Sequence, residues 1–201
     1  RDQGVVGVTS NPTIFQQAIG AGDVYADAIR ARVAGPTPLA GMPLYESLAV
    51  EDVQTACDAL REVFERSGGL DGRVSIEVDP RRAHDAAGTV SEARRLRERV
   101  GRPNVMIKVP ATAAGLPAVR TLIGEGVCVN VTLIFSLARY EQVMEAYLAG
   151  LEDRAARGGD LASVVSVASF FVSRVDSKVD AAIARRIEEL PVGAPERAEL
   201  L

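Results

Sequence analysis

The stretch NVMIKVP at residues 104–110 places a lysine, Lys108, inside a short run of apolar and β-branched residues. Its side chains alternate with period two, so Met106 and Lys108 share one face while the valines and the isoleucine share the other. A run of this length and composition predicts a β-strand that is covered on both faces. A charge inside such a strand costs free energy unless it is paired or serves a function, which makes Lys108 the first candidate for chemistry.

Four more runs rich in valine flank this strand, at residues 5–11 (VVGVTSN), 73–79 (RVSIEVD), 127–135 (VCVNVTLIF) and 164–172 (VVSVASFFV). Stretches with the three- and four-residue spacing of amphipathic helices separate them or follow the last one, at 24–33, 50–67, 83–99, 113–124, 137–157 and 174–190. The segment GPTPLAGMP at 35–43 is predicted to be a loop. Alternating strands and helices predict a parallel sheet with right-handed crossovers.

Period two also groups polar side chains on one face of the other strands. These are Thr9 and Asn11 in the first strand, Ser75, Glu77 and Asp79 in the second, Cys128, Asn130 and Thr132 in the fourth, and Ser169 with Phe171 in the fifth. Most lie towards the C-terminal ends of their strands, where the loops of a parallel barrel gather and where its chemistry is found. We therefore predict an interior site at that rim.

Lys108 and Glu77 have two interpretations. Desolvation should favour the neutral amine of Lys108, the form that attacks a ketone carbonyl, and Glu77 could then move protons directly or through a water held by Thr132. Alternatively, the two side chains form a buried ion pair with a structural role. The two roles are compatible.

Three other residues are less decisive. Asp79 is expected to shape the strand exit or to cap the helix that begins near Ala83. Arg174, at the start of the last long helix, either binds a phosphate group or pairs with Asp176 or Asp180. His84, the only histidine, is expected on the surface without a part in the reaction.

The composition favours one globular domain that binds small molecules. The 201 residues are 47% hydrophobic and 25% charged, and the net charge of −4 provides no broad cationic surface for nucleic acid or anionic lipid. No membrane-length apolar run or secretory signal occurs, and Cys57 and Cys128 form no CxxC motif, so we expect reduced cysteines and a cytoplasmic location. We expect no metal site, and the sequence does not indicate an oligomeric state.

Five collinear motifs resemble the transaldolase family, and specifically its actinobacterial-like branch. They are GVTSNPTIF, SIEVDPR, NVMIKVPAT, GVCVNVTLIFS and SVASFFVSRVD, and the resemblance extends from Val5 to about Ile187. It implies a (β/α)8 TIM barrel of the class I aldolase type, of which a single partial domain over residues 1–201 would hold strands 2 to 6 with their helices. It also implies transfer of a dihydroxyacetone unit from sedoheptulose 7-phosphate to glyceraldehyde 3-phosphate in the pentose phosphate pathway, without a cofactor.

The resemblance assigns roles to individual residues. Lys108 would form the Schiff base, Glu77 would act as acid and base through a bound water, and Thr132 would help to hold that water. Asn11 and Asn130 would bind substrate hydroxyls, with Thr9 in the same neighbourhood, and Ser169 would contact the terminal hydroxyl. Phe171 would form a wall of the site, and Arg174 would hold the phosphate.

The family pattern also contains parts that this sequence lacks. A first strand with an acid/base aspartate, and two last strands with further phosphate ligands, find no counterpart, and the sequence starts at Arg1 rather than at a methionine. We therefore expect that residues precede and follow this sequence, and that the 201 residues alone would be unstable or inactive because the barrel edges stay open. The competing hypotheses are an enzyme like fructose 6-phosphate aldolase, which usually has an amide in place of Glu77, and a non-catalytic sugar-phosphate-binding barrel fragment.

Overall fold

A computed structural model describes residues 4–200 and contains one parallel five-stranded sheet. Its strands follow the chain in the order β1 (Gly7–Thr9), β2 (Arg73–Glu77), β3 (Val105–Pro110), β4 (Val129–Ile134) and β5 (Ser166–Phe170). Each lies inside one of the five predicted runs, and every neighbouring pair is parallel. The predicted strand order and direction are confirmed, because long helical connections allow each strand to lie beside the next.

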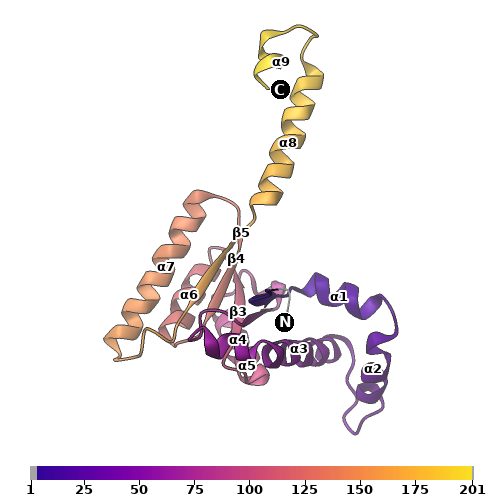
Figure 1. Cartoon of the computed structure of the whole chain (residues 1–201), viewed down its shortest axis with the longest axis vertical. Coiled ribbons are helices and arrows are strands. Elements are labelled where there is room, and N and C mark those ends of the chain that lie inside the picture. The colour runs from indigo at the N-terminus through magenta and orange to yellow at the C-terminus, as the bar shows by residue number, and fades with distance from the viewer. Residues whose placement is uncertain (1–3, 201) are drawn as a thin grey trace.

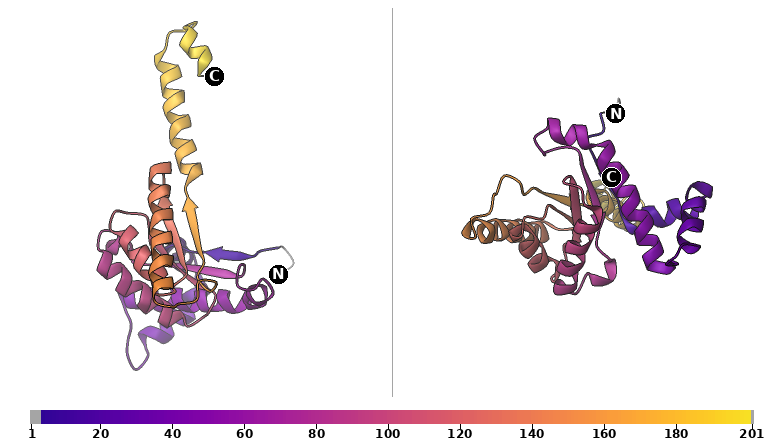
Figure 2. Two further views of the ribbon diagram at one scale, coloured as in Figure 1. Left: turned by 90° about the vertical axis from the view of Figure 1, so that its left-hand side faces the viewer. Right: turned by 90° about the horizontal axis from the view of Figure 1, so that it is seen from below.

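Helices cover the outer side of this curled sheet (Figures 1 and 2). They are α3 (Gly41–Ala59), α4 (Arg61–Arg66), α5 (Ala86–Val100), α6 (Gly115–Gly124) and α7 (Leu137–Ala156). Strand residues of the outer face, such as Ile107, Val109 and Val129, are fully buried against helix residues such as Leu122 and Ile123. The hydrophobic core therefore lies between sheet and helices, as expected when amphipathic helices pack on a parallel sheet.

The N-terminal helices differ from the prediction. Helix α1 (Pro12–Gly20) was not predicted, although Asn11 and Pro12 form a standard start: the Asn11 Oδ1 accepts a hydrogen bond from the Ile14 N–H at 2.9 Å. A 3₁₀ turn, η1 (Asp23–Tyr25), leads into α2 (Ala26–Val33). Helix α3 begins at Gly41, inside the predicted loop, because Pro43 falls in a first turn whose N–H groups need no intrahelical partner.

Of the two roles predicted for Asp79, the structure has the shaping of the strand exit rather than the cap of the following helix. The Asp79 carboxylate caps a 3₁₀ turn, η2 (Pro80–Arg82), by accepting from the Arg81 N–H at 2.9 Å. The following helix α5 is capped instead by Asp85, whose Oδ1 accepts from the Gly88 N–H at 2.8 Å. His84, between the two caps, is exposed as predicted.

The last helices form an arm that extends away from the sheet (Figure 1). Helix α8 (Val172–Glu189) follows β5 almost directly and buries none of its residues, and the short α9 (Pro195–Glu199) lies beyond it. Helix α8 starts two residues earlier than predicted. Within residues 4–200, no helix is both long and apolar enough to cross a membrane.

Candidate active site

The inner face of the sheet has a buried polar row across its three central strands. In the strand register Glu77 of β2 lies beside Lys108 of β3, and Lys108 lies beside Asn130 of β4. Lys108 and Asn130 are buried, at 6% and 3% exposure, and so is Thr132. Period two in the sequence predicted this shared face, and the geometry confirms it.

Lys108 has two polar partners. Its Nζ lies 3.1 Å from the Glu77 Oε2 and donates a hydrogen bond to the Ser10 carbonyl oxygen at 3.0 Å. The Lys108 and Glu77 side chains are only 7% and 12% exposed, so little water competes for this contact. The two groups are therefore enclosed together, and the Lys108 Nζ lies close enough to the Glu77 carboxylate for a direct exchange of a proton.

Asn130 is fixed by hydrogen bonds on both sides of its amide. Its Nδ2 donates to the Ser75 Oγ at 3.1 Å, and its Oδ1 accepts from the Ser169 Oγ at 2.8 Å. The structure thus brings the predicted residues Asn130 and Ser169 together. Ser75, 4% exposed, was grouped on this face by its period but not chosen as a site residue.

The first strand contributes differently from what was predicted. Thr9 lies level with Ser75 in the register but is exposed. The next residue, Ser10, is buried: its Oγ donates to the Ser75 carbonyl at 2.7 Å, and its own carbonyl accepts from Lys108. Sequence reasoning missed Ser10 because a backbone oxygen carries no side-chain signal.

Asn11 lies at the rim rather than in the polar row. Its Oδ1 is occupied by the cap of α1, and the residue lines a cleft of about 660 Å³ that also reaches Glu77. The cleft lies between α1, α3, the C-terminal end of β2, the turn η2 and the middle of α5. Its apolar lining includes Phe15 and Tyr45, whose rings meet edge to face. Glu77 is therefore the residue that connects the cleft with Lys108.

The electrostatics of this cleft keep Tyr45 protonated. Burial, and then the charges of Glu77 and Asp79, raise the pKa of the Tyr45 hydroxyl to about 12. Tyr45 therefore offers a neutral O–H group on the cleft side of Glu77. Tyr45 could not be found from the sequence, because one tyrosine between a predicted loop and a predicted helix is indistinguishable from a packing residue.

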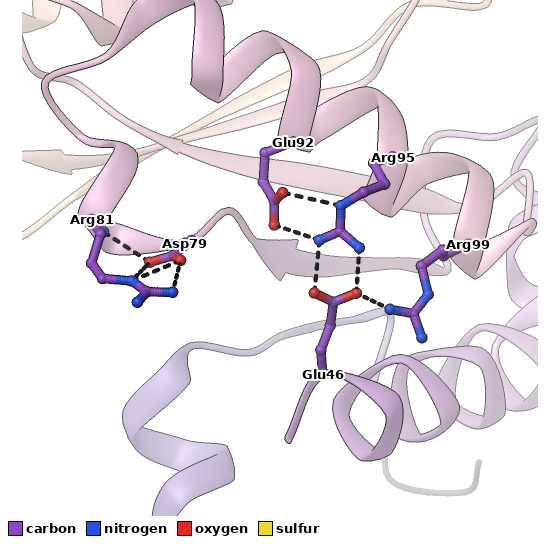
Figure 3. Close-up of polar contacts among 6 residues, drawn as sticks. All are labelled: Glu46, Asp79, Arg81, Glu92, Arg95 and Arg99. Carbon is purple, nitrogen blue, oxygen red and sulfur yellow. Dashed lines mark hydrogen bonds and ion pairs between the residues drawn. The ribbon is translucent and has the colours of Figure 1, made fainter. Parts of the chain in front are cut away.

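Charged residues on the cleft wall are already paired with one another (Figure 3). Arg95 binds Glu46 with two hydrogen bonds of 2.6 and 2.7 Å, and it also contacts Glu92. Arg99 adds a further bond to Glu46. These hydrogen bonds, of which those from Arg95 have the largest effect, hold the pKa of the Glu46 carboxyl below its ordinary value. Burial acts in the opposite direction and raises this pKa.

Asp79 belongs to the same wall and is neutralised locally. The Nε of Arg81 donates to both carboxylate oxygens of Asp79, at 3.0 and 2.9 Å, and the Nη2 of Arg81 donates to the Asp79 Oδ2 at 2.5 Å. These bonds hold the pKa of the Asp79 carboxyl below its usual range. The cleft thus provides satisfied charges rather than a free cationic site.

The predicted phosphate ligand lies at the C-terminal end of β5. The Arg174 guanidinium lies over the Phe171 ring at 4.4 Å from its centroid, and Phe171 stacks on Phe135 with centroids 5.4 Å apart. Within residues 4–200 Arg174 forms no ion pair, so the alternative of a pair with Asp176 or Asp180 is not what the structure has. Phe135 was not among the predicted site residues.

A curled parallel sheet with helices on its outer side (Figure 1), and with a lysine, a carboxylate and an amide side by side on its inner face, has the arrangement of an α/β-barrel enzyme wall. The family model described as transaldolase/fructose-6-phosphate aldolase matches residues 1–195, and the chain belongs to this family. The members of this family are TIM barrels, so the predicted fold class is confirmed, and the five strands form part of such a barrel.

Curated relatives agree with the family assignment. The chain is 55% identical over its whole length to transaldolase 1 of Streptomyces coelicolor, of which it covers 52%. It is 50% identical to a transaldolase of a Parafrankia species, again over the whole chain and 52% of that protein. A Thermobifida fusca transaldolase is 53% identical over 88% of the chain and 47% of its own length. The predicted actinobacterial-like resemblance is confirmed, and the chain spans about half the length of the curated relatives it matches.

Proposed function

We propose that this protein is a transaldolase that transfers a dihydroxyacetone unit from sedoheptulose 7-phosphate to glyceraldehyde 3-phosphate. The observation that carries the proposal is the buried contact of 3.1 Å between Lys108 and Glu77, in register with Asn130 on the inner face of the sheet. A lysine in this position can form a Schiff base, and the names of the relatives give the reaction class. Sugar phosphates would be the ligands, and we expect a cytoplasmic location.

The chemistry begins with a proton transfer within the ion pair. Lys108 gives a proton to Glu77, and the neutral amine adds to the C2 carbonyl of the ketose to form a carbinolamine. Glu77 then returns a proton to the C2 hydroxyl, directly or through a water held by Thr132, and water leaves as the Schiff base forms. The carbonyl of Ser10, 3.0 Å from the Nζ, orients the amine for this attack.

The Schiff base then acts as an electron sink. A base then takes the C4 hydroxyl proton, the role that the family resemblance implies for the first-strand aspartate outside this sequence. The C3–C4 bond breaks, erythrose 4-phosphate is released, and the three-carbon unit stays on Lys108 as an enamine. The enamine attacks the aldehyde carbon of glyceraldehyde 3-phosphate, and hydrolysis releases fructose 6-phosphate and the free lysine. Asn130 and Ser169, joined by a hydrogen bond of 2.8 Å, would bind hydroxyls of the three-carbon unit, with Asn11 and Thr9 at the rim.

Borohydride trapping tests the proposal. Incubation of the complete protein, with the residues that we expect on either side of this sequence, with fructose 6-phosphate and sodium borohydride should reduce the Schiff base to a stable secondary amine. Peptide mass mapping should then place the adduct on Lys108. Lys108→Met should abolish the adduct, whereas Lys178→Met, on the exposed side of α8, should not. An adduct on another residue would contradict the role of Lys108, and the absence of any adduct would favour a sugar-phosphate-binding protein without catalysis.

An aldolase of the fructose 6-phosphate type remains the second candidate function, since the family includes both activities in its description. Glu77 favours transfer, because the aldolases of this kind usually carry an amide there. Initial rates of fructose 6-phosphate cleavage measured with and without erythrose 4-phosphate distinguish the two. A transaldolase needs the aldose acceptor for turnover, so equal rates would favour the aldolase.

A further inference from the structure

Phe135 occupies an unusual place at the end of β4. Leu133, two residues before it, has a positive φ of 61°, the only such non-glycine residue within residues 4–200. The register between β4 and β5 shifts between Val131 and Ile134, where the alternation is interrupted. As a result Ile134 is fully buried, whereas Leu133 and Phe135 are 38% and 45% exposed.

The interrupted alternation moves Phe135 to the side of the sheet that carries Phe171. With strict period two Phe135 would share the face of Leu133, Val131 and Val129, which packs against the helices. Instead its ring stacks on Phe171, at an interplanar angle of 24° and a centroid separation of 5.4 Å. Strained backbone of this kind persists only where the surroundings require it and is common at functional sites.

Phe171 in turn supports Arg174. The guanidinium lies 4.4 Å from the centroid of the Phe171 ring, and no carboxylate within residues 4–200 pairs with it. The first turn of α8 has no side-chain cap, so its N–H groups are also available beside Arg174. The position of the Arg174 cation over this helix start therefore depends on a stack of two rings that come from consecutive strand ends.

We propose that Phe135 is a positioning residue for the substrate's phosphate group, which it reaches through Phe171 and Arg174. This inference rests on the proposed function, because it takes Arg174 as the phosphate ligand. Phe135 itself would not contact the reacting atoms. Its loss would let the Phe171 ring turn, and Arg174 would then sample positions that do not meet the phosphate. The effect should be confined to phosphorylated substrates.

Steady-state kinetics with paired substrates test this role. We expect Phe135→Leu to raise KM for fructose 6-phosphate about 3- to 10-fold, the loss expected for one aromatic contact. The kcat should change by less than about 2-fold, because the chemistry at Lys108 is untouched. With dihydroxyacetone as the three-carbon donor and unphosphorylated glyceraldehyde as the acceptor, no phosphate is present, and both constants should stay near those of the unmodified protein. Phe135→Tyr keeps the ring and should restore the KM.

A neighbouring aromatic residue provides the matched control. Phe170 meets Tyr140 edge to face at 6.1 Å and packs against the helix-covered core, so Phe170→Leu should lower the melting temperature without changing the ratio of the two KM values. Equal effects of Phe135→Leu on both substrates, or no effect on either, would overturn the positioning role. Borohydride trapping with dihydroxyacetone separates this outcome from failure of the proposed function, because only the latter predicts no adduct on Lys108 in the unmodified protein.

Discussion

At the scale of single residues, the polar row depends on how Asn130 is held. Ser75 and Ser169 bond opposite ends of its amide, so the amide orientation is fixed before substrate arrives. Ser75 does this from β2, the strand that also carries Glu77. The hydrogen bond therefore links β2 and β4 through side chains across β3, which lies between them in the sheet.

Removal of the Ser75 hydroxyl should weaken this preorganisation. We expect Ser75→Ala to lower kcat/KM about 3- to 10-fold and the free energy of unfolding by about 1 kcal/mol, the usual contribution of one buried hydrogen bond. Ser47→Ala is the control, since the Ser47 hydroxyl bonds only the Leu44 carbonyl within α3. Enzyme assays and urea denaturation measure both effects. An unchanged kcat/KM in Ser75→Ala would show that catalysis does not depend on the hydrogen bond by which Ser75 orients the Asn130 amide.

The sequence predicted side chains of this site better than backbone groups. Period two on short buried strands identified Glu77, Lys108, Asn130 and Thr132, because a polar residue in a strand covered on both faces is conspicuous. It did not identify the Ser10 carbonyl that binds Lys108, since every residue has a carbonyl and only the fold selects one. The cap that Asn11 provides for α1 was not predicted either, because helix α1 itself was not predicted.

At the scale of elements, the strands and the later helices were predicted to within a few residues, whereas α1 and the start of α3 were not. Alternating valines bounded all five strands to within a few residues. Helix α1 follows β1 after only two residues and is nine residues long, so its helical period had little length in which to appear. The left-handed residue in β4 has no signature either, because Leu133 is a leucine where glycine or asparagine is usual.

Leu133 permits a direct test of backbone strain. A β-branched residue fits the left-handed region worse than leucine, so Leu133→Val should lower the free energy of unfolding by about 1–2 kcal/mol. Leu133→Gly relieves the strain and loses some apolar contact, so it should stay within about 1 kcal/mol of the unmodified protein. Urea denaturation midpoints give the comparison. The control is Leu161→Val, at a residue that is 44% exposed and outside the left-handed region. Equal midpoints for Leu133→Val and Leu133→Gly would argue against strain.

At the scale of the whole molecule, helices far apart in the sequence are joined around the cleft. Glu46 of α3 and Arg95 and Arg99 of α5 form the ion-pair group that connects the two helices beside the end of β2 (Figure 3). Sequence reasoning found no cleft there, because its walls come from α1, α3 and α5 and depend on how these helices pack. The projecting α8 was equally unforeseen, since an amphipathic pattern predicts a helix but not the surface that it covers.

This ion-pair group should make stability depend on pH. The pKa of Glu46 is lowered below its ordinary value of 4.5, chiefly by the hydrogen bonds of Arg95. A carboxyl group whose folded pKa is depressed adds stability above its unfolded pKa and loses that contribution as the pH falls through the folded pKa. Glu46→Gln should therefore lower the free energy of unfolding by about 1–2 kcal/mol at pH 7, and the deficit should shrink below about pH 4.

The exposed Glu51, which pairs with Arg32, supplies the control, and Glu51→Gln should cost less than about 0.5 kcal/mol. Urea denaturation at pH 7 and below pH 4 measures these differences. The stabilising role of the Glu46 ion pairs would be contradicted if Glu46→Gln and Glu51→Gln lost equal stability, or if the Glu46→Gln deficit persisted in acid.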